Sequence, residues 1–218
     1  MADNTDYGHP GMGGVRIGFG KRPALIVIDM QHDFVDPDAP TTCAPIAQRA
    51  VPHISRLLAA ARQARVPVFY TQGLVRPDLS DVGLWKSKAR QEGRVLVEGT
   101  RGAAIIEESA PQEGDIVIRK RRPSAFFNTE LDVFLRAFQI DTLIVTGTSM
   151  SGGVRATIVD AFSRDLRVIV PRQCVVDRME AVLEANLADV DAKYADVIDV
   201  QEALSYLEGL RPKIPIAS

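Results

Sequence analysis

The chain has 218 residues, of which 46% are hydrophobic and 25% are charged, and its formal net charge is −2. A chain of this size and composition can bury the core of one sizeable domain. The slightly acidic balance argues against nucleic acid as a partner, because domains that bind nucleic acid carry a surplus of basic residues.

Cysteine content and hydropathy indicate a cytoplasmic protein without a membrane partner. Cys43 and Cys174 are the only cysteines, too few for a disulfide framework. Residues 1–14 lack the charged start and apolar core of a signal peptide. No apolar run approaches the ~20 residues that a membrane-spanning helix needs.

The first half of the chain alternates strand and helix patterns. The run Ala24–Asp29 is apolar up to its final acid, as is typical of a strand buried on both faces. Apolar residues at helical spacing over 54–61 predict a helix with Pro52 in its first turn. Val66–Gln72 is predicted to be the next strand. The charged, irregular segment Gly73–Pro111 indicates a loop with one or two short helices.

The second half is more regular. Strands are predicted over Asp115–Lys120, Thr142–Gly147, Arg167–Pro171 and Asp196–Val200. Apolar spacing predicts helices over about residues 128–138, 154–162, 179–190 and 202–210. Asn128 is expected to cap the first of these helices.

This alternation predicts an α/β fold with three layers, α/β/α, around a mostly parallel, doubly wound sheet of the Rossmann-like kind. We find no internal repeat or linker and expect a single domain over residues 1–218, with residues 1–20 as an N-terminal extension.

Three polar or flexible features follow strands of the predicted sheet. In open α/β sheets the functional site lies beyond the carboxyl ends of the strands. Asp29, Lys120 and the turn Gly147–Gly153 each lie at or just beyond such an end. An aspartate–lysine pair there supplies a base and a cation, although the same pair could be a structural salt bridge. The basic run Arg119–Arg122 is expected to line the site or face solvent rather than bind phosphate.

Three segments carry a family resemblance: ALIVIDMQHDF from Ala24, IRKRRPSAFFNTELDVFL from Ile118, and VTGTSMSGGVRATIVDAFSRDLRVIVPRQCVVDR from Val145. From about Arg16 to Leu210 the chain resembles the isochorismatase-like cysteine hydrolases. It is most similar to the branch of N-carbamoylsarcosine amidohydrolase and related small-amide hydrolases. The resemblance implies an amidohydrolase that acts on a small amide or ureido (carbamoyl) compound and releases ammonia through a thioester.

The resemblance places the family's catalytic aspartate, lysine and cysteine at Asp29, Lys120 and Gly153. The aspartate would take the thiol proton, and the lysine would hold the ionised groups. Gly153 departs from the pattern, because a glycine has no nucleophilic side chain. The resemblance also implies a cis peptide bond between Thr148 and Ser149, which would aim the Ser149 N–H, with that of Gly153, at an oxyanion.

Three explanations of Gly153 stay open. The chain is a nucleophile knockout of an amide hydrolase, of the kind made to trap a substrate, and is inactive by the thioester route. Alternatively, it is a natural vinyl-ether hydrolase of the isochorismatase type, which uses Asp29 without a cysteine. The third possibility is a binding paralogue without catalysis.

No other nucleophile or metal is predicted. Ser149 and Ser151 would face different directions along the turn, and both cysteines are expected to be packed thiols. Metal-binding relatives use an Asp-x-His motif that this chain lacks in the corresponding interval, and His53 is expected on a helix surface. We therefore expect no catalytic metal and no cofactor.

Substrate recognition is expected from a few further residues. By resemblance, Arg178 lies where a relative binds its substrate's carboxylate, while pairing with Asp177 or capping of the next helix is the structural alternative. Phe34, Trp85 and Phe127 are candidates for an apolar wall, or for core packing. The resemblance implies a homo-oligomer, a tetramer or a dimer. The segment with Leu84, Trp85 and Val95 would form a subunit contact, unless Trp85 fills the domain's own core.

Overall fold

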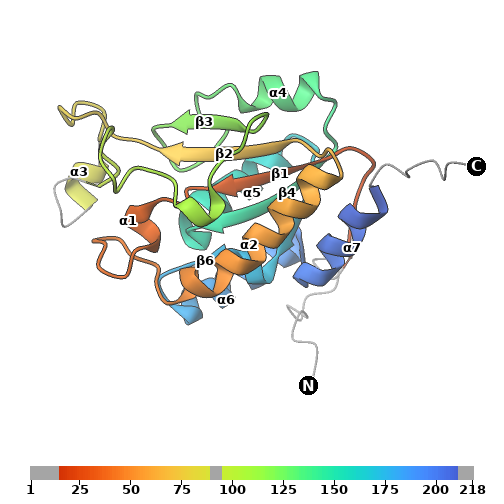
Figure 1. Cartoon of the computed structure of the whole chain (residues 1–218). Helices are drawn as coiled ribbons and strands as arrows, with labels where there is room; N and C mark the ends of the chain where they lie inside the picture. Colours follow the sequence, from red (N-terminus) through yellow and green to blue (C-terminus); the bar gives the residue numbers. More distant parts are fainter. Residues whose placement is uncertain (1–14, 89–94, 211–218) are drawn as a thin grey trace, which may run out of the picture.

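A computed structural model describes residues 15–88 and 95–210 of the chain (Figure 1). Seven parallel strands form one sheet in the order β3-β2-β1-β4-β5-β7, and β6 pairs with β4. The strands are β1 Pro23–Ile28, β2 Val68–Gly73, β3 Ile116–Lys120, β4 Thr142–Thr148, β5 Arg167–Pro171, β6 Val175–Val176 and β7 Asp196–Ile198.

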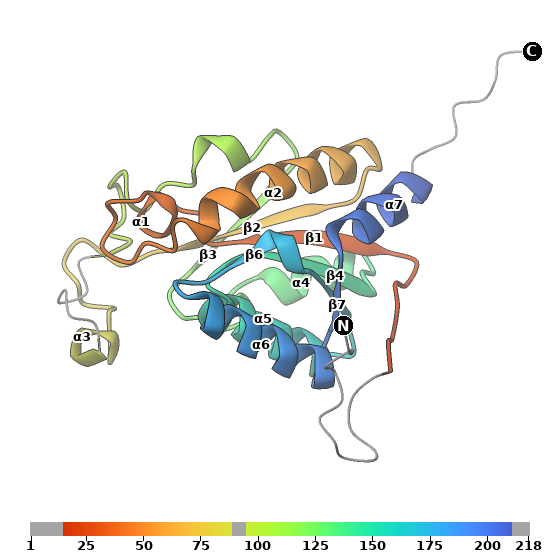
Figure 2. The same cartoon turned by 90° about the horizontal axis from the view of Figure 1, so that it is seen from below.

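Helices cover both faces of this sheet, which confirms the three-layer α/β/α fold. Figure 2 shows α2 and α7 on one face and α4, α5 and α6 on the other. These helices are α2 Ile46–Gln63, α4 Leu131–Ala137, α5 Arg155–Phe162, α6 Glu180–Lys193 and α7 Val200–Leu210. The short helices are α1 His32–Val35, α3 Trp85–Lys88, η1 Glu107–Ser109 and η3 Arg172–Cys174. Among the described residues, no helix is both long and apolar enough to cross a bilayer.

The core lies along the two central strands, and this explains their composition. Every residue of β1 and β4 is buried, because helices pack on both sides of these strands. The chain runs outward from β1 through β2 to β3, and then returns to β4 on the other side of β1. The strand order therefore reverses between β1 and β4, and such a switch point is where ligands bind in this architecture.

Several predicted boundaries were wrong. The helix α2 begins at Ile46, so Pro52 lies in its interior; the buried Ile46 and Ala47 extend its apolar stripe further back than expected. Asn128 does not cap α4, which begins at Leu131; Asn128 instead has a left-handed backbone with φ of 52°.

The last predicted strand is also shorter than expected. It ends at Ile198, and Val200 is already the first residue of α7. The buried side chain of Val200 belongs to the buried face of α7 rather than to the sheet.

Candidate active site

Asp29 and Lys120 form a buried ion pair at the carboxyl edge of the sheet. Lys120 Nζ donates a hydrogen bond of 2.6 Å to Asp29 Oδ2, and the two residues are 4% and 5% exposed. The ammonium also donates to the carbonyl oxygens of Arg122 and Pro123, at 3.3 Å and 3.1 Å. Its three N–H donors thus have three acceptors, which is what a buried ammonium requires.

The end of β2 leaves room for this pair. β2 lies between the strands that carry Asp29 and Lys120, and it ends in Gly73, which is paired in register with Lys120. A β-carbon on Gly73 would lie 3.6 Å from Asp29 Oδ2 and 3.2 Å from Leu96 Cδ1. Leu96 therefore lies over the strand ends near the carboxylate, and no sequence pattern predicted this placement.

Thr71 holds the other oxygen of the same carboxylate. Its hydroxyl donates to Asp29 Oδ1 at 2.7 Å, and its oxygen accepts the backbone N–H of Asp29 at 3.2 Å. Both residues are buried. The aspartate is thus fixed from two sides, with Oδ1 toward Thr71 and Oδ2 toward Lys120. Sequence reasoning missed Thr71, whose one signal was a hydroxyl near the end of an apolar strand.

The turn after β4 brings Gly153 beside Asp29. The peptide bond between Thr148 and Ser149 is cis, and a tight turn over Met150–Val154 leads into α5. A β-carbon on Gly153 would lie 3.3 Å from Asp29 Oδ2 and 3.1 Å from the Pro123 carbonyl oxygen. A side chain at position 153 would therefore point at the carboxylate that Lys120 and Thr71 orient.

Asp177, the residue after β6, fixes this turn from the neighbouring strand end. Its carboxylate accepts the backbone N–H of Ser151 at 2.6 Å and that of Arg178 at 2.8 Å. Asp177 is only 2% exposed, so these two bonds compensate for the burial of its charge. Sequence reasoning considered Asp177 only as a partner for the Arg178 side chain and missed its hold on the Ser151 backbone.

Arg178 itself is exposed, and neither structural alternative for its side chain is observed. Over the described parts of the chain, its guanidinium forms no hydrogen bond or ion pair, and only its backbone N–H contacts Asp177. The helix α6 begins at Glu180 without a side-chain cap.

The three aromatic candidates do not gather into one wall. Phe34 is half-buried and packs against the core, directly after the strand end that carries Asp29. Trp85 and Phe127 are each 53% exposed, so the alternative of core packing was wrong for both. Trp85 begins α3, which both views place at the outer edge of the molecule, away from β1 and β4 (Figures 1 and 2).

Neither cysteine is placed as a substitute nucleophile. Cys43 and Cys174 are both fully buried. Burial raises the pKa of the Cys43 thiol and that of the Cys174 thiol, so neither forms a thiolate readily. His53 lies half-buried on α2, and no group of three or more metal-ligating side chains occurs in the part of the chain that the structure describes.

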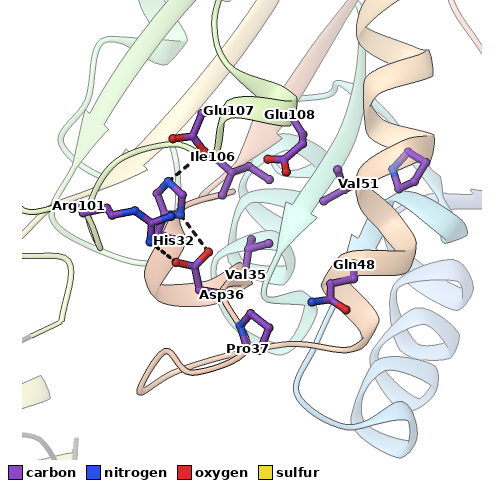
Figure 3. A pocket seen from close by; sticks show the side chains of 11 residues that line it. His32, Val35, Asp36, Pro37, Gln48, Val51, Arg101, Ile106, Glu107 and Glu108 are labelled. Carbon is purple, nitrogen blue, oxygen red and sulfur yellow. Dashed lines mark hydrogen bonds and ion pairs between the residues drawn. The ribbon is translucent and has the colours of Figure 1, made fainter.

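A cavity of about 320 Å³ lies elsewhere, between α1, α2 and η1 (Figure 3). It is lined by His32 and Asp36, whose side chains pair at 2.9 Å, and by Arg101, Glu107 and apolar residues, but not by Asp29, Lys120 or Gly153. Asp36 also pairs with Arg101. The lining carries three carboxylates, those of Asp36, Glu107 and Glu108, and none of the residues at the strand ends. We therefore assign the chemistry to the strand ends.

Comparisons with known proteins identify the family. The model of the isochorismatase domain matches residues 23–202. The chain is 42% identical to maleamate amidohydrolase of Pseudomonas putida over 96% of this chain and 98% of that one. It is 40% identical to N-carbamoylsarcosine amidase of Arthrobacter sp. over 89% of this chain and 75% of the relative. Among solved structures, a cysteine hydrolase from Pseudomonas syringae pv. phaseolicola superimposes with a TM-score of 0.82 at 30% identity, covering 87% of this chain and 93% of the other.

Proposed function

Because the chain belongs to the isochorismatase-like family, and to the amidohydrolases within it, we propose that its strand-end site hydrolyses a small amide or ureido compound. The observation that carries the proposal is the position of residue 153. Its side-chain direction points at Asp29 Oδ2, which Lys120 also contacts at 2.6 Å. That arrangement suits a nucleophile, a base and a cation in one buried place.

With cysteine at position 153, the reaction follows from this geometry. Asp29 takes the thiol proton, and the thiolate attacks the carbonyl carbon of the substrate. The N–H groups of residues 149 and 153 hold the developing oxyanion at the start of α5. Ammonia or an amine then leaves, and water hydrolyses the thioester. With Gly153 this route is closed, because position 153 has no thiol and both cysteines are buried elsewhere.

The unpaired guanidinium of Arg178 supports a substrate with a carboxylate. It is exposed two residues beyond β6, which pairs with β4 beside the turn at Gly153. A planar guanidinium matches a carboxylate with two parallel hydrogen bonds. The two relatives in the comparison act on maleamate and on N-carbamoylsarcosine, as their names say. Of the three aromatic candidates, Phe34 follows Asp29 in the chain and is proposed as an apolar contact of the substrate, whereas Trp85 and Phe127 are exposed and do not join it in one wall.

A second candidate is vinyl-ether hydrolysis of the isochorismatase type. Gly153 favours it, because Asp29 would act there as an acid and no cysteine is needed. The unmodified chain would then turn over isochorismate and lose that activity on Asp29→Ala. A binding paralogue, in contrast, would bind a ligand without turnover whichever residue stood at position 153.

We also propose that the chain assembles as a homo-oligomer, a tetramer or a dimer. Leu84 and Trp85, next to each other at the start of α3, are 85% and 53% exposed. Large exposed apolar side chains in sequence are typical of a subunit contact. Light scattering should give a mass of several 23.8 kDa chains, and a monomer that still binds substrate would contradict the proposal.

The decisive test of the activity is Gly153→Cys. We expect this variant to release ammonia from maleamate, from N-carbamoylsarcosine or from another member of a panel of amide and carbamoyl compounds. The matched control is Gly153→Ala, which adds a β-carbon without a thiol. No ammonia from the cysteine variant over a broad panel would refute the amidohydrolase proposal.

A further inference from the structure

Two hydrogen-bond acceptors face the side-chain direction of Gly153. The nearest neighbours of a β-carbon built there are the Pro123 carbonyl oxygen at 3.1 Å, Asp29 Oδ2 at 3.3 Å, and a methyl carbon of Ile28 at 3.5 Å. A free molecule cannot occupy the β-carbon position itself, which lies at bonding distance from the glycine Cα. A small molecule just beyond it along the same direction is bordered by these two oxygens and must therefore donate hydrogen bonds. A thiol donates one proton, whereas a water molecule donates two.

The cation of the site is already engaged by the same two oxygens. Lys120 Nζ donates to Asp29 Oδ2 at 2.6 Å and to the Pro123 carbonyl oxygen at 3.1 Å. Each of these oxygens has a second lone-pair direction that can accept from a further donor. The lysine thus balances the charge of the carboxylate without supplying a donor of its own toward position 153.

We propose that, with glycine at position 153, the site binds a small neutral nucleophile in place of the cysteine. This nucleophile attacks the substrate carbonyl directly, and no covalent intermediate with the protein forms. This inference rests on the proposed function, since it concerns the same site and the same carbonyl compounds. The nucleophile donates hydrogen bonds to Asp29 and Pro123, and this leaves a lone pair free to face the substrate. Water fits these requirements, and hydroxylamine is the probe.

The atoms balance with the groups present. As the new bond to the carbonyl carbon forms, one proton of the nucleophile passes to Asp29 Oδ2. When the carbon–nitrogen bond of the amide breaks, Asp29 returns that proton to the leaving nitrogen. With an amide such as maleamate, water thus gives a carboxylic acid and ammonia, and hydroxylamine gives a hydroxamic acid and ammonia. With an N-carbamoyl compound, water gives a carbamic acid and hydroxylamine gives an N-hydroxyurea, again with ammonia. The two acceptor oxygens also predict which nucleophiles react. An anion such as azide has no proton to donate to them and should not react.

The test uses the unmodified chain with maleamate or N-carbamoylsarcosine. We expect slow release of ammonia in buffer and a rate that rises with hydroxylamine concentration. The new product should be the hydroxamate from maleamate or the N-hydroxyurea from N-carbamoylsarcosine. Azide should give no acceleration. Asp29→Asn should lower both rates by about 10²–10⁴-fold, the usual contribution of a positioned base.

Gly153→Ala is the sharper control, because its methyl group projects into the space that a nucleophile beside Asp29 needs. The rates of its reactions with water and with hydroxylamine should both fall at least about tenfold. Its melting temperature and its substrate binding in calorimetry should stay unchanged. If this variant does not fold, the hydroxylamine dependence of the unmodified chain and its loss in Asp29→Asn decide the question instead.

The two proposals fail separately. Ammonia from Gly153→Cys but none from the unmodified chain, with or without hydroxylamine, would overturn the direct-attack inference and leave the proposed function intact. An alanine variant as reactive as the unmodified chain would also overturn it. No turnover by either the cysteine variant or the unmodified chain would refute the proposed function itself.

Discussion

The hydroxyl of Thr71 donates a hydrogen bond of 2.7 Å to Asp29 Oδ1, and its oxygen accepts the backbone N–H of the same aspartate at 3.2 Å. Thr71 therefore sets the direction of Oδ2, the oxygen that faces Lys120 and position 153. It belongs to β2 and the aspartate follows β1, so the parallel register of the two strands creates the contact.

Thr71→Val should lower kcat and leave KM nearly unchanged. Valine keeps the volume of the side chain but cannot orient the carboxylate. The misplaced base slows the chemical step, whereas substrate binding is unaffected. We expect a loss of about tenfold in the Gly153→Cys background. Thr71→Ser keeps the hydroxyl and should restore most of the rate. Equal losses in both variants, with a lowered melting temperature, would indicate a purely structural role.

Lys120→Met should destabilise the fold strongly, because it leaves the buried Asp29 carboxylate without its cation. Breaking one partner of a buried pair costs about 3–5 kcal/mol of unfolding free energy. The double variant Asp29→Asn/Lys120→Met removes both charges and should recover most of that loss. Urea unfolding of the two variants measures the difference. A single variant as stable as the double would show that the pair does not hold a buried charge.

The strands were predictable because their apolar runs are long and end at polar residues. The place of the site followed from the rule that ligands of open α/β sheets bind beyond the carboxyl ends of the strands. Asp29 and Lys120 could be paired on that basis alone. Thr71 and Asp177 could not, because their roles depend on register: Thr71 faces Ile28 across the β1–β2 pair, and β6 runs beside the end of β4. A polar residue in a strand pattern does not say which neighbour it will contact.

Other failures have the same origin in tertiary context. Trp85 is too exposed to be a core residue. Its aromatic character alone could not show whether its helix would lie at the surface or pack into the core. Asn128 was a good cap by residue type. The segment before α4 is held instead by Thr129, whose hydroxyl bonds to the Ala125 carbonyl oxygen, and by the bond from the Ala125 N–H to Thr157.

Asp177→Asn should impair catalysis as well as stability. Its carboxylate accepts two backbone N–H groups, and an amide offers one acceptor atom and an amino group that cannot accept. We expect a cost of about 1–3 kcal/mol in unfolding free energy and a lower kcat in the Gly153→Cys background, since the turn at Ser151 loosens.

A matched control for this variant is available in the same chain. Asp196 is also buried, and its carboxylate accepts two backbone N–H groups, those of Ile17 and Gly18. It lies at the first residue of β7, at the opposite end of the sheet from the site. Asp196→Asn should therefore cost similar stability without changing kcat. An equal fall of kcat in both variants would mean that Asp177 acts only through stability.

Arg178→Ala should raise KM for substrates that carry a carboxylate. The guanidinium would lose its charge-assisted bonds to that group, and this predicts an increase of about ten- to a hundredfold. Arg178→Lys should recover only part of the affinity, because an ammonium cannot form the bidentate pair. An uncharged amide of similar size is the control substrate. A uniform change in KM for charged and uncharged substrates would exclude a role in carboxylate recognition.

Stability should fall as the pH rises from 10 to 12. Burial raises the pKa of Tyr70 to about 12, above its usual value of 10.0. Between these two values the unfolded chain loses the phenolic proton while the folded chain keeps it, so the unfolded state is favoured progressively. The stabilisation is complete below pH 10 and is lost as the pH approaches 12. For this residue, the loss between pH 9 and pH 11 is about 1.3 kcal/mol. Urea unfolding at the two pH values measures it, and Tyr70→Phe should show a loss smaller by about this amount. A variant with the same pH dependence as the unmodified chain would assign the effect to other groups, of which Tyr206, whose pKa burial also raises to about 12, is the first to test.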